Sequence, residues 1–168
     1  MITLVLGGAR SGKSRYAEDL ALRRPAPRYY LATAEARDHE MALRIREHQR
    51  RRADDWITLE EPLELPGALR RHGAEAGATL LVDCLTLWLS NLMGAGRDID
   101  ATTAALVAAC DGVRGEAIFV ANEVGLGIVP NNALARAFRD HAGRLNQAVA
   151  ARADRVVFVA AGLPLVLR

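Results

Sequence analysis

The residues best suited to chemistry stand near the start of the chain, where Gly7 to Ser14 reads G-G-A-R-S-G-K-S. This segment satisfies the pattern G-x-x-x-x-G-K-[ST] and directly follows the apolar run Ile2–Leu6. Glycines let the backbone curl so that successive N–H groups converge on phosphate oxygens, and the following helix adds its positive N-terminal dipole. We therefore expect Lys13 to neutralise β- and γ-phosphate charge and the Ser14 hydroxyl to ligate Mg²⁺. The competing interpretation is a glycine-rich turn with an accidental lysine.

A Mg²⁺ site of this kind usually needs a carboxylate at the end of a neighbouring strand, and L-L-V-D supplies one in Asp83. We expect Asp83 to lie at the carboxyl edge of a sheet, near the phosphate loop. Asp83 also suits an N-cap for a helix beginning at Leu85. The two roles are compatible, and the metal role is favoured.

A second candidate for chemistry is His48, which lies in E-M-A-L-R-I-R-E-H-Q-R-R-R. On a helix, Arg44 would lie four residues before it, and Arg51 and Arg52 three and four residues after it. Nearby cations favour the neutral imidazole, whose free lone pair allows in-line attack on an α-phosphorus. Taken alone, a solvated helix face is the commoner explanation of such a histidine. A nucleic-acid patch is a further alternative, although the run has no interleaved aromatic residues.

The elements that must position these residues alternate between short apolar strands and helices. Strands are predicted at 2–6, 28–32, 56–59, 79–82, 117–121, 155–160 and 165–167, and helices at 13–24, 38–53, 63–72, 85–93, 101–113 and from 131 or 132 to about 153. Strands without polar alternation indicate a parallel sheet that is buried on both faces. We predict one α/β domain over residues 1–168, a mostly parallel sheet flanked by helices, of the P-loop type.

Composition excludes several classes of protein. The 168 residues carry 22 basic and 20 acidic side chains, so a general nucleic-acid coat is disfavoured. Cys84 and Cys110 are too few for a secreted disulfide scaffold and are expected to be reduced packing residues. The N-terminus has no basic segment before its short apolar run, and no apolar stretch approaches the length of a membrane span. The expected compartment is the cytoplasm.

Three segments together resemble one enzyme family. They are G-G-A-R-S-G-K-S-R-Y-A-E, E-M-A-L-R-I-R-E-H, and N-E-V-G-L-G-I-V-P-N-N-A-L-A-R-A-F-R-D-H-A-G-R-L-N-Q. The chain resembles, over nearly its whole length, the bifunctional adenosylcobinamide kinase/adenosylcobinamide-phosphate guanylyltransferase family of cobalamin biosynthesis. This resemblance implies that ATP or GTP phosphorylates adenosylcobinamide, and that GMP then passes from GTP to adenosylcobinamide phosphate through a guanylylated histidine, here His48. It also implies a RecA-like sheet and a homotrimer.

The same resemblance extends the set of expected site residues. The nucleotide contacts that it implies, together with the phosphate loop, are Gly7, Gly8, Ala9, Arg10, Ser11, Gly12, Lys13, Ser14, Thr33, Ala34, Glu35, Gln49, Arg50, Arg51, Arg52, Glu60 and Asp83. Catalysis is assigned to His48 and Lys13, and the Mg²⁺ site to Ser14 and Asp83. Many relatives have a glutamate where this chain has Asp83, and Glu61 is a second acidic candidate beside Glu60.

Two rival functions remain open at the level of sequence. A simple small-molecule kinase would need no covalent intermediate, and a non-enzymatic nucleotide-binding module would attach to nucleic acid through Arg50–Arg52. The loop 122–132 is expected to collect ligand-facing residues at a strand end. On the helix after it, Arg136, Arg139 and Arg144 would contact phosphates or a neighbouring subunit, or serve helix solubility, with Arg136 paired to Asp140.

Overall fold

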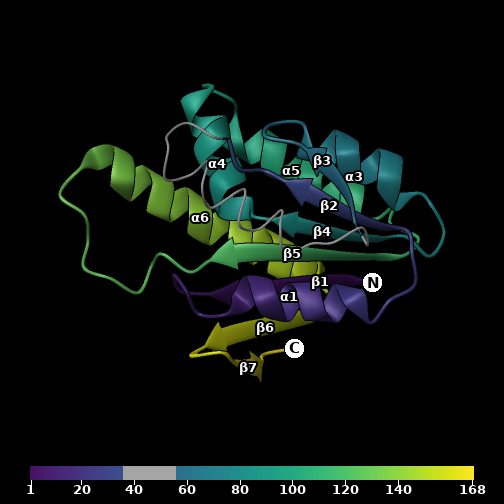
Figure 1. Cartoon of the computed structure of the whole chain (residues 1–168). Helices are drawn as coiled ribbons and strands as arrows, with labels where there is room; N and C mark the ends of the chain where they lie inside the picture. Colours follow the sequence, from purple (N-terminus) through teal and green to yellow (C-terminus); the bar gives the residue numbers. More distant parts are fainter. Residues whose placement is uncertain (36–55) are drawn as a thin grey trace.

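A seven-stranded sheet forms the centre of the computed structural model, which describes residues 1–35 and 56–168 (Figure 1). The strands are β1 (Ile2–Gly7), β2 (Arg28–Ala32), β3 (Ile57–Glu60), β4 (Thr79–Asp83), β5 (Glu116–Asn122), β6 (Arg155–Ala160) and β7 (Leu163–Val166). Their order across the sheet is β3-β2-β4-β5-β1-β6-β7. All neighbouring pairs are parallel except β6 and β7, which form an antiparallel hairpin at one edge.

Helices cover both faces of this sheet. They are α1 (Lys13–Leu22), α3 (Leu65–Gly73), α4 (Leu85–Gly94), α5 (Ile99–Cys110) and α6 (Ala133–Arg152). Helix α1 packs on one face, where Val5, Leu81 and Val120 surround its buried alanines. Helices α3 to α6 lie on the other face, over a larger apolar cluster that includes Leu4, Trp88 and other buried side chains. Because both faces are covered, the central strands β1, β4 and β5 are buried along almost their whole length and are mostly apolar, as predicted.

The structure confirms the predicted α/β class, and most predicted element boundaries lie within two residues of the observed ones. Strand β2 begins and ends at the predicted residues, and α6 begins after Asn132, whose Oδ1 accepts hydrogen bonds from the backbone of Leu134 and Ala135. Helix α5 begins two residues earlier than predicted because Asp98 caps it, accepting a 2.9 Å bond from the Ala101 N–H. The helix predicted at 38–53 lies outside the described residues.

Two further expectations from the sequence can be compared with the described residues. Cys84 and Cys110 are both free and buried, which agrees with their predicted role in packing. Among the helices of residues 1–35 and 56–168, none combines the length and the apolar character that a membrane crossing needs.

Candidate functional site

The predicted phosphate loop connects β1 to α1 at the carboxyl edge of the sheet. Gly12 has φ +95° and Arg10 has φ +54°, so the loop curls through two left-handed positions. A Cβ on Gly7 would lie 2.5 Å from both the Ser11 Oγ and the Val159 carbonyl oxygen, so only glycine fits there. A Cβ on Gly8 would meet no atom within 4 Å, which leaves open space beside the loop. The sequence therefore forms a cradle with room for a ligand.

The first turn of α1 is prepared to receive an anion. Its N-cap, Gly12, offers no side-chain hydrogen bond, and no acidic residue lies in the first turn. The N–H groups of such a turn have no partner within the helix, so a phosphate group can accept from them. The Ser11 hydroxyl oxygen is buried without a hydrogen-bond partner among the described residues. An unsatisfied polar atom in this cradle is what a bound phosphate would satisfy.

Lys13 lies at the start of α1 with its side chain turned back over the loop. Its Nζ donates a 3.1 Å hydrogen bond to the Gly8 carbonyl oxygen, and the residue is 8% exposed. Burial lowers the pKa of Lys13 from its usual 10.5, although the nearby Cys84 thiol, once ionised, and the Asp83 carboxylate act to raise it. A buried ammonium group with one neutral acceptor gains much from an incoming phosphate.

Asp83 ends β4 on the same face of the sheet as α1. The register places Glu60, Ala32 and Asp83 side by side across β3, β2 and β4. The Tyr30 hydroxyl donates a 2.9 Å hydrogen bond to the Asp83 Oδ2. The predicted place of Asp83 in the sheet needs one correction. Strand β5 separates β4 from β1, so Asp83 does not end a neighbouring strand, and it reaches the cradle region because α1 packs across β4 and β5.

The N-cap interpretation of Asp83 is wrong. Helix α4 has Cys84 at its N-cap position, and no side-chain hydrogen bond caps it. The carboxylate is held by Tyr30 instead, which leaves the Asp83 Oδ1 without a hydrogen-bond partner in the described part of the chain.

The segment after β2 is tied to the segment after β4 by buried hydrogen bonds. The Thr33 Oγ1 accepts from the Cys84 N–H and donates to the Cys84 carbonyl oxygen, both at 2.8 Å. The Asn91 Nδ2 donates to the carbonyl oxygens of Thr33, at 2.8 Å, and Pro62, at 3.2 Å. Asn91 therefore joins helix α4 to the chain after β2, which carries Thr33–Glu35, and to the chain that directly follows Glu60 at the end of β3.

Glu60 and Glu61 differ in their surroundings. Glu60 is exposed at the end of β3, and its side-chain carboxylate forms no hydrogen bond or ion pair in the described part of the chain. The Glu61 carboxylate lies 3.3 Å from an Arg71 guanidinium nitrogen and is largely buried. Of the two acidic candidates, Glu60 is the one left open to a ligand.

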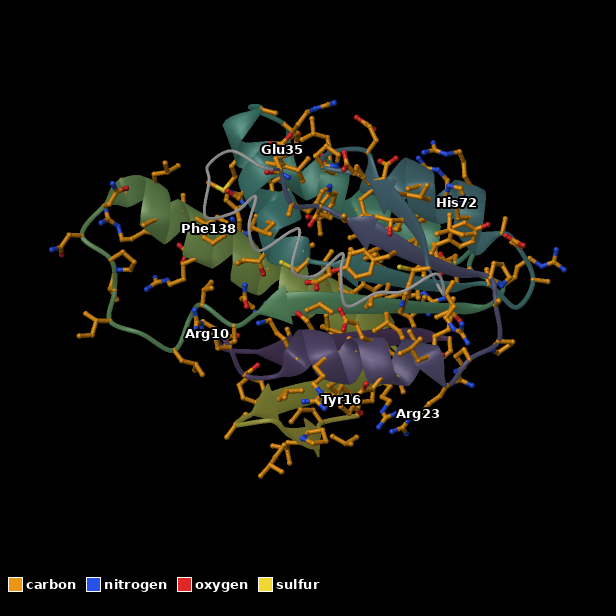
Figure 2. The ribbon with its side chains drawn as sticks, in the orientation of Figure 1. Arg10, Tyr16, Arg23, Glu35, His72 and Phe138 are labelled. Carbon is orange, nitrogen blue, oxygen red and sulfur yellow. The ribbon has the colours of Figure 1, made fainter. Side chains whose placement is uncertain are left out.

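Figure 2 shows toward which end of the strands several labelled side chains lie. Arg10 on the loop and Glu35 after β2 lie toward one end, whereas Arg23 and His72 lie toward the other. The carboxyl edge thus gathers the described part of the predicted site, namely Gly7–Ser14, Thr33–Glu35, Glu60 and Asp83. His48, Gln49, Arg50, Arg51 and Arg52 lie outside the described residues.

A Mg²⁺ ion fits the oxygen ligands at this edge. Ser14 offers a hydroxyl on the first turn of α1, and Asp83 offers its unpartnered Oδ1. No group of three or more His, Cys, Asp or Glu side chains arranged for a metal occurs within 1–35 and 56–168. Mg²⁺ is usually held by one or two protein oxygens and the substrate phosphates, and the Ser14 hydroxyl and the Asp83 carboxylate are oxygen ligands of that kind.

The loop between β5 and α6 extends past the carboxyl edge (Figure 1). Its apolar side chains are open to solvent, with Leu126 85% and Ile128 98% exposed. Arg136 donates to the carbonyl oxygens of Pro130 and Asn131, so it anchors this loop, and the alternative in which it pairs with Asp140 is wrong. Asp140 is paired with Arg139 instead.

Sequence reasoning missed Tyr30 and Asn91. Both are polar side chains in apolar surroundings, 3% and 5% exposed, and such groups need internal hydrogen-bond partners. That signal was present in the sequence, because Tyr30 lies in a buried strand and Asn91 in an apolar helix. Their partners depend on strand order and register, which the sequence did not specify.

Comparison with known proteins places the chain in a known group. Residues 3–167 match the family model described as cobinamide kinase / cobinamide phosphate guanyltransferase. A bifunctional adenosylcobalamin biosynthesis protein, CobP, from Pseudomonas aeruginosa is 51% identical over 100% of this chain and 98% of its own length. The CobU protein of the same description from Salmonella typhimurium is 43% identical over 97% of each chain.

Solved structures agree on the fold. The flagellar accessory protein FlaH from Methanocaldococcus jannaschii superposes with a TM-score of 0.56, at 11% identity, over 99% of this chain and 77% of its own. The RadB recombinase gives 0.50 at 14% identity, over 94% and 73%. These matches support the predicted RecA-like P-loop sheet.

Proposed function

The chain belongs to the cobinamide kinase / cobinamide phosphate guanyltransferase family, and from this membership we propose the two reactions that it performs. It is a bifunctional cobalamin-biosynthesis enzyme that phosphorylates adenosylcobinamide and then converts adenosylcobinamide phosphate to adenosylcobinamide-GDP. The observation that carries this proposal is the cradle at Gly7–Ser14, with its uncapped helix and buried Lys13, inside a chain that matches the family from end to end.

In the kinase step, the hydroxyl oxygen of the aminopropanol arm attacks the γ-phosphorus of ATP or GTP. The bond from that phosphorus to the β-bridging oxygen breaks, the nucleoside diphosphate leaves, and the hydroxyl proton passes to solvent. Lys13 and the N–H groups at the start of α1 stabilise the charge on the transferred group. Bound Mg²⁺, held by Ser14 and Asp83, would neutralise charge on the phosphate oxygens.

In the guanylyl step, a neutral His48 nitrogen attacks the α-phosphorus of GTP, and pyrophosphate leaves. A phosphate oxygen of adenosylcobinamide phosphate then attacks the same phosphorus, the N–P bond breaks, and the imidazole is released unchanged. Gln49–Arg52, Thr33–Glu35 and Glu60 are proposed to contact the nucleotide. The match to the family supports these roles, and the position of Glu60 beside Ala32 and Asp83 in the sheet agrees with them.

We further propose a cytoplasmic homotrimer. The exposed apolar side chains of the β5–α6 loop and of β7, among them Ile128 and Leu163, offer surface that contact between subunits would cover. Light scattering should give a mass of three times 18.2 kDa. A monomer mass at all concentrations would contradict this assembly.

Labelled GTP tests the guanylyl step directly. Protein mixed with GTP that carries label on the α-phosphate should become covalently labelled, and acid should remove the label because a histidine phosphoramidate is acid-labile. Adenosylcobinamide phosphate should then take up the label. His48→Ala should prevent labelling, whereas His141→Ala, on α6, should not.

The outcomes separate the proposal from a simple kinase. Transfer of γ-phosphate alone, with no covalent label and no effect of His48→Ala, would favour a monofunctional small-molecule kinase. Label retained in His48→Ala would contradict the assignment of the nucleophile but leave the two reactions in place.

A further inference from the structure

Tyr30 lies directly beside the proposed metal carboxylate. Tyr30 is 3% exposed, and its ring packs in the apolar cluster on the α1 face of the sheet. The ring also makes an edge contact with Trp56, at 5.8 Å between the ring centroids. The Tyr30 hydroxyl donates a 2.9 Å hydrogen bond to the Oδ2 of Asp83, which lies at the carboxyl end of β4. A side chain packed in this way presents its hydroxyl from a fixed position, since the ring has little room to turn.

Asp83 and Lys13 are close enough for their charges to interact, yet they form no ion pair in the described part of the chain. Lys13 donates to the Gly8 carbonyl oxygen, and Asp83 accepts from Tyr30. Each charged group is therefore held by a neutral partner, so Lys13 remains free to meet a phosphate and the Asp83 Oδ1 remains free to meet a cation. A direct ion pair between the two would remove both from the ligand.

We propose that Tyr30 is a positioning residue that fixes the Asp83 carboxylate for Mg²⁺ and keeps it from pairing with Lys13. This inference rests on the proposed function, because it assigns Asp83 to the metal of bound nucleotide. It also accounts for an aspartate at a position where a longer acid would reach further. With one oxygen fixed by the phenol, the shorter carboxylate presents its other oxygen in a single direction.

The test is a Mg²⁺ titration of the full chain in the presence of GTP. The binding of Mg²⁺ is measured by the GTP-dependent rise in Tm and by calorimetry. Tyr30→Phe removes one oxygen and keeps the packed ring. We expect the Mg²⁺ concentration at half-effect to rise roughly tenfold or more, since partners behind a metal ligand carry effects of that size. The Tm of the ligand-free protein should change little by comparison.

The neighbouring residue provides a matched control. The Tyr29 hydroxyl donates 2.7 Å to the Glu75 carboxylate at an exposed position on the other face of β2. Tyr29→Phe therefore also removes one phenol–carboxylate hydrogen bond but should leave the Mg²⁺ midpoint at the wild-type value. An equal shift in both variants would mean a general effect on the sheet and would overturn the proposal.

A double-mutant cycle shows whether Tyr30 acts through Asp83. Asp83→Asn should itself weaken the Mg²⁺ response, and adding Tyr30→Phe to it should produce no further shift. Additive shifts, or an unchanged Mg²⁺ midpoint in Tyr30→Phe, would overturn the proposal while the wild-type response kept the proposed function intact. A wild-type protein with no Mg²⁺ response to GTP would overturn both.

Discussion

Gly12 of the phosphate loop lies against Gly162 of the β6–β7 turn, so closely that a Cβ on Gly12 would be 3.2 Å from the Gly162 Cα. The Gly162 N–H also donates a 2.8 Å hydrogen bond to the Ser11 carbonyl oxygen. The β6–β7 hairpin at the edge of the sheet therefore packs against the phosphate loop and supports its backbone. Gly12 and Gly162, 150 positions apart in the sequence, thus share one function, which is to fix the shape of the loop.

Gly12→Ala should destabilise the protein by about 1–2 kcal/mol, because a left-handed φ is costly for a residue with a Cβ. The close contact with Gly162 adds to that cost, so the loop should also lose affinity for GTP. Denaturant unfolding checks the first effect and calorimetry the second. Gly8→Ala is the stability control, since its Cβ would enter open space. Equal stability of the two variants would contradict this account.

Lys13→Met should abolish the rise in Tm that GTP causes, yet leave the ligand-free Tm unchanged or higher. Methionine fills similar space, and the substitution removes a buried ammonium group whose desolvation is unfavourable in the absence of phosphate. Thermal unfolding with and without GTP measures both quantities. Arg15→Met removes the same charge from an exposed position on α1 and should keep the GTP response. A large drop in ligand-free Tm for Lys13→Met would argue against a desolvation cost.

Periodicity in the sequence predicted the elements well because several strands here are short apolar runs that end at glycine or a charged residue. Strand β1 ends in this way at Gly7, β3 at Glu60 and β4 at Asp83. The strand order was not predictable in the same way. Nothing local in the sequence indicates that β5 lies between β4 and β1, since that order depends on how the crossover helices pack.

The parts of the site that lie in one contiguous segment could be predicted from the sequence, whereas contacts between distant segments could not. The loop at Gly7–Ser14 is contiguous, so its motif alone predicts a cradle of the kind that the structure contains. The contact of Tyr30 with Asp83 spans 53 residues, and that of Asn91 with Thr33 spans 58. Such contacts follow from sheet register, which the sequence pattern does not encode. The role of His48 stays a prediction.

Cys84 and Cys110 should make the protein less stable as the pH rises above about 9. Burial raises the pKa of each thiol from 9.0 to about 11. Between these values the unfolded chain loses thiol protons that the native protein retains, so stability falls with rising pH through that window. Lys13 has the opposite effect on the pH dependence of stability, because folding lowers its pKa. The Lys13→Met variant lacks this effect, so in it the thiols can be observed alone.

Thiol labelling gives an independent check of the same burial. At about pH 8 the native protein should react slowly with a thiol reagent, and both thiols should react at once after denaturation. Cys110→Ala leaves Cys84 as the single thiol, which tests the residue nearest the cradle. If the Tm of this variant equals that of the wild type, rapid labelling of Cys84 would show that the thiol is accessible and would contradict the raised pKa.

Asn91→Leu should lower both stability and nucleotide affinity. It removes the amide that donates to the carbonyl oxygens of Thr33 and Pro62, and a buried acceptor left without its donor costs about 1–3 kcal/mol. Because the same two carbonyls belong to the segments that carry Thr33–Glu35 and Glu60, we expect GTP affinity to fall as well. Asn91→Asp should be worse, since an ionised carboxylate would face two carbonyl oxygens.

A second core variant distinguishes a specific loss of GTP affinity from a loss caused by general destabilisation. Leu106→Ala, in α5, creates a cavity at a fully buried position and should cost about 2–5 kcal/mol. Its side chain packs among the helices behind the sheet, so GTP affinity measured well below its Tm should match wild type. If Leu106→Ala and Asn91→Leu lost affinity equally, Asn91 would be a stability residue with no specific link to the site. Affinity lost only in Asn91→Leu would mean that one buried amide holds two nucleotide-contacting segments in register.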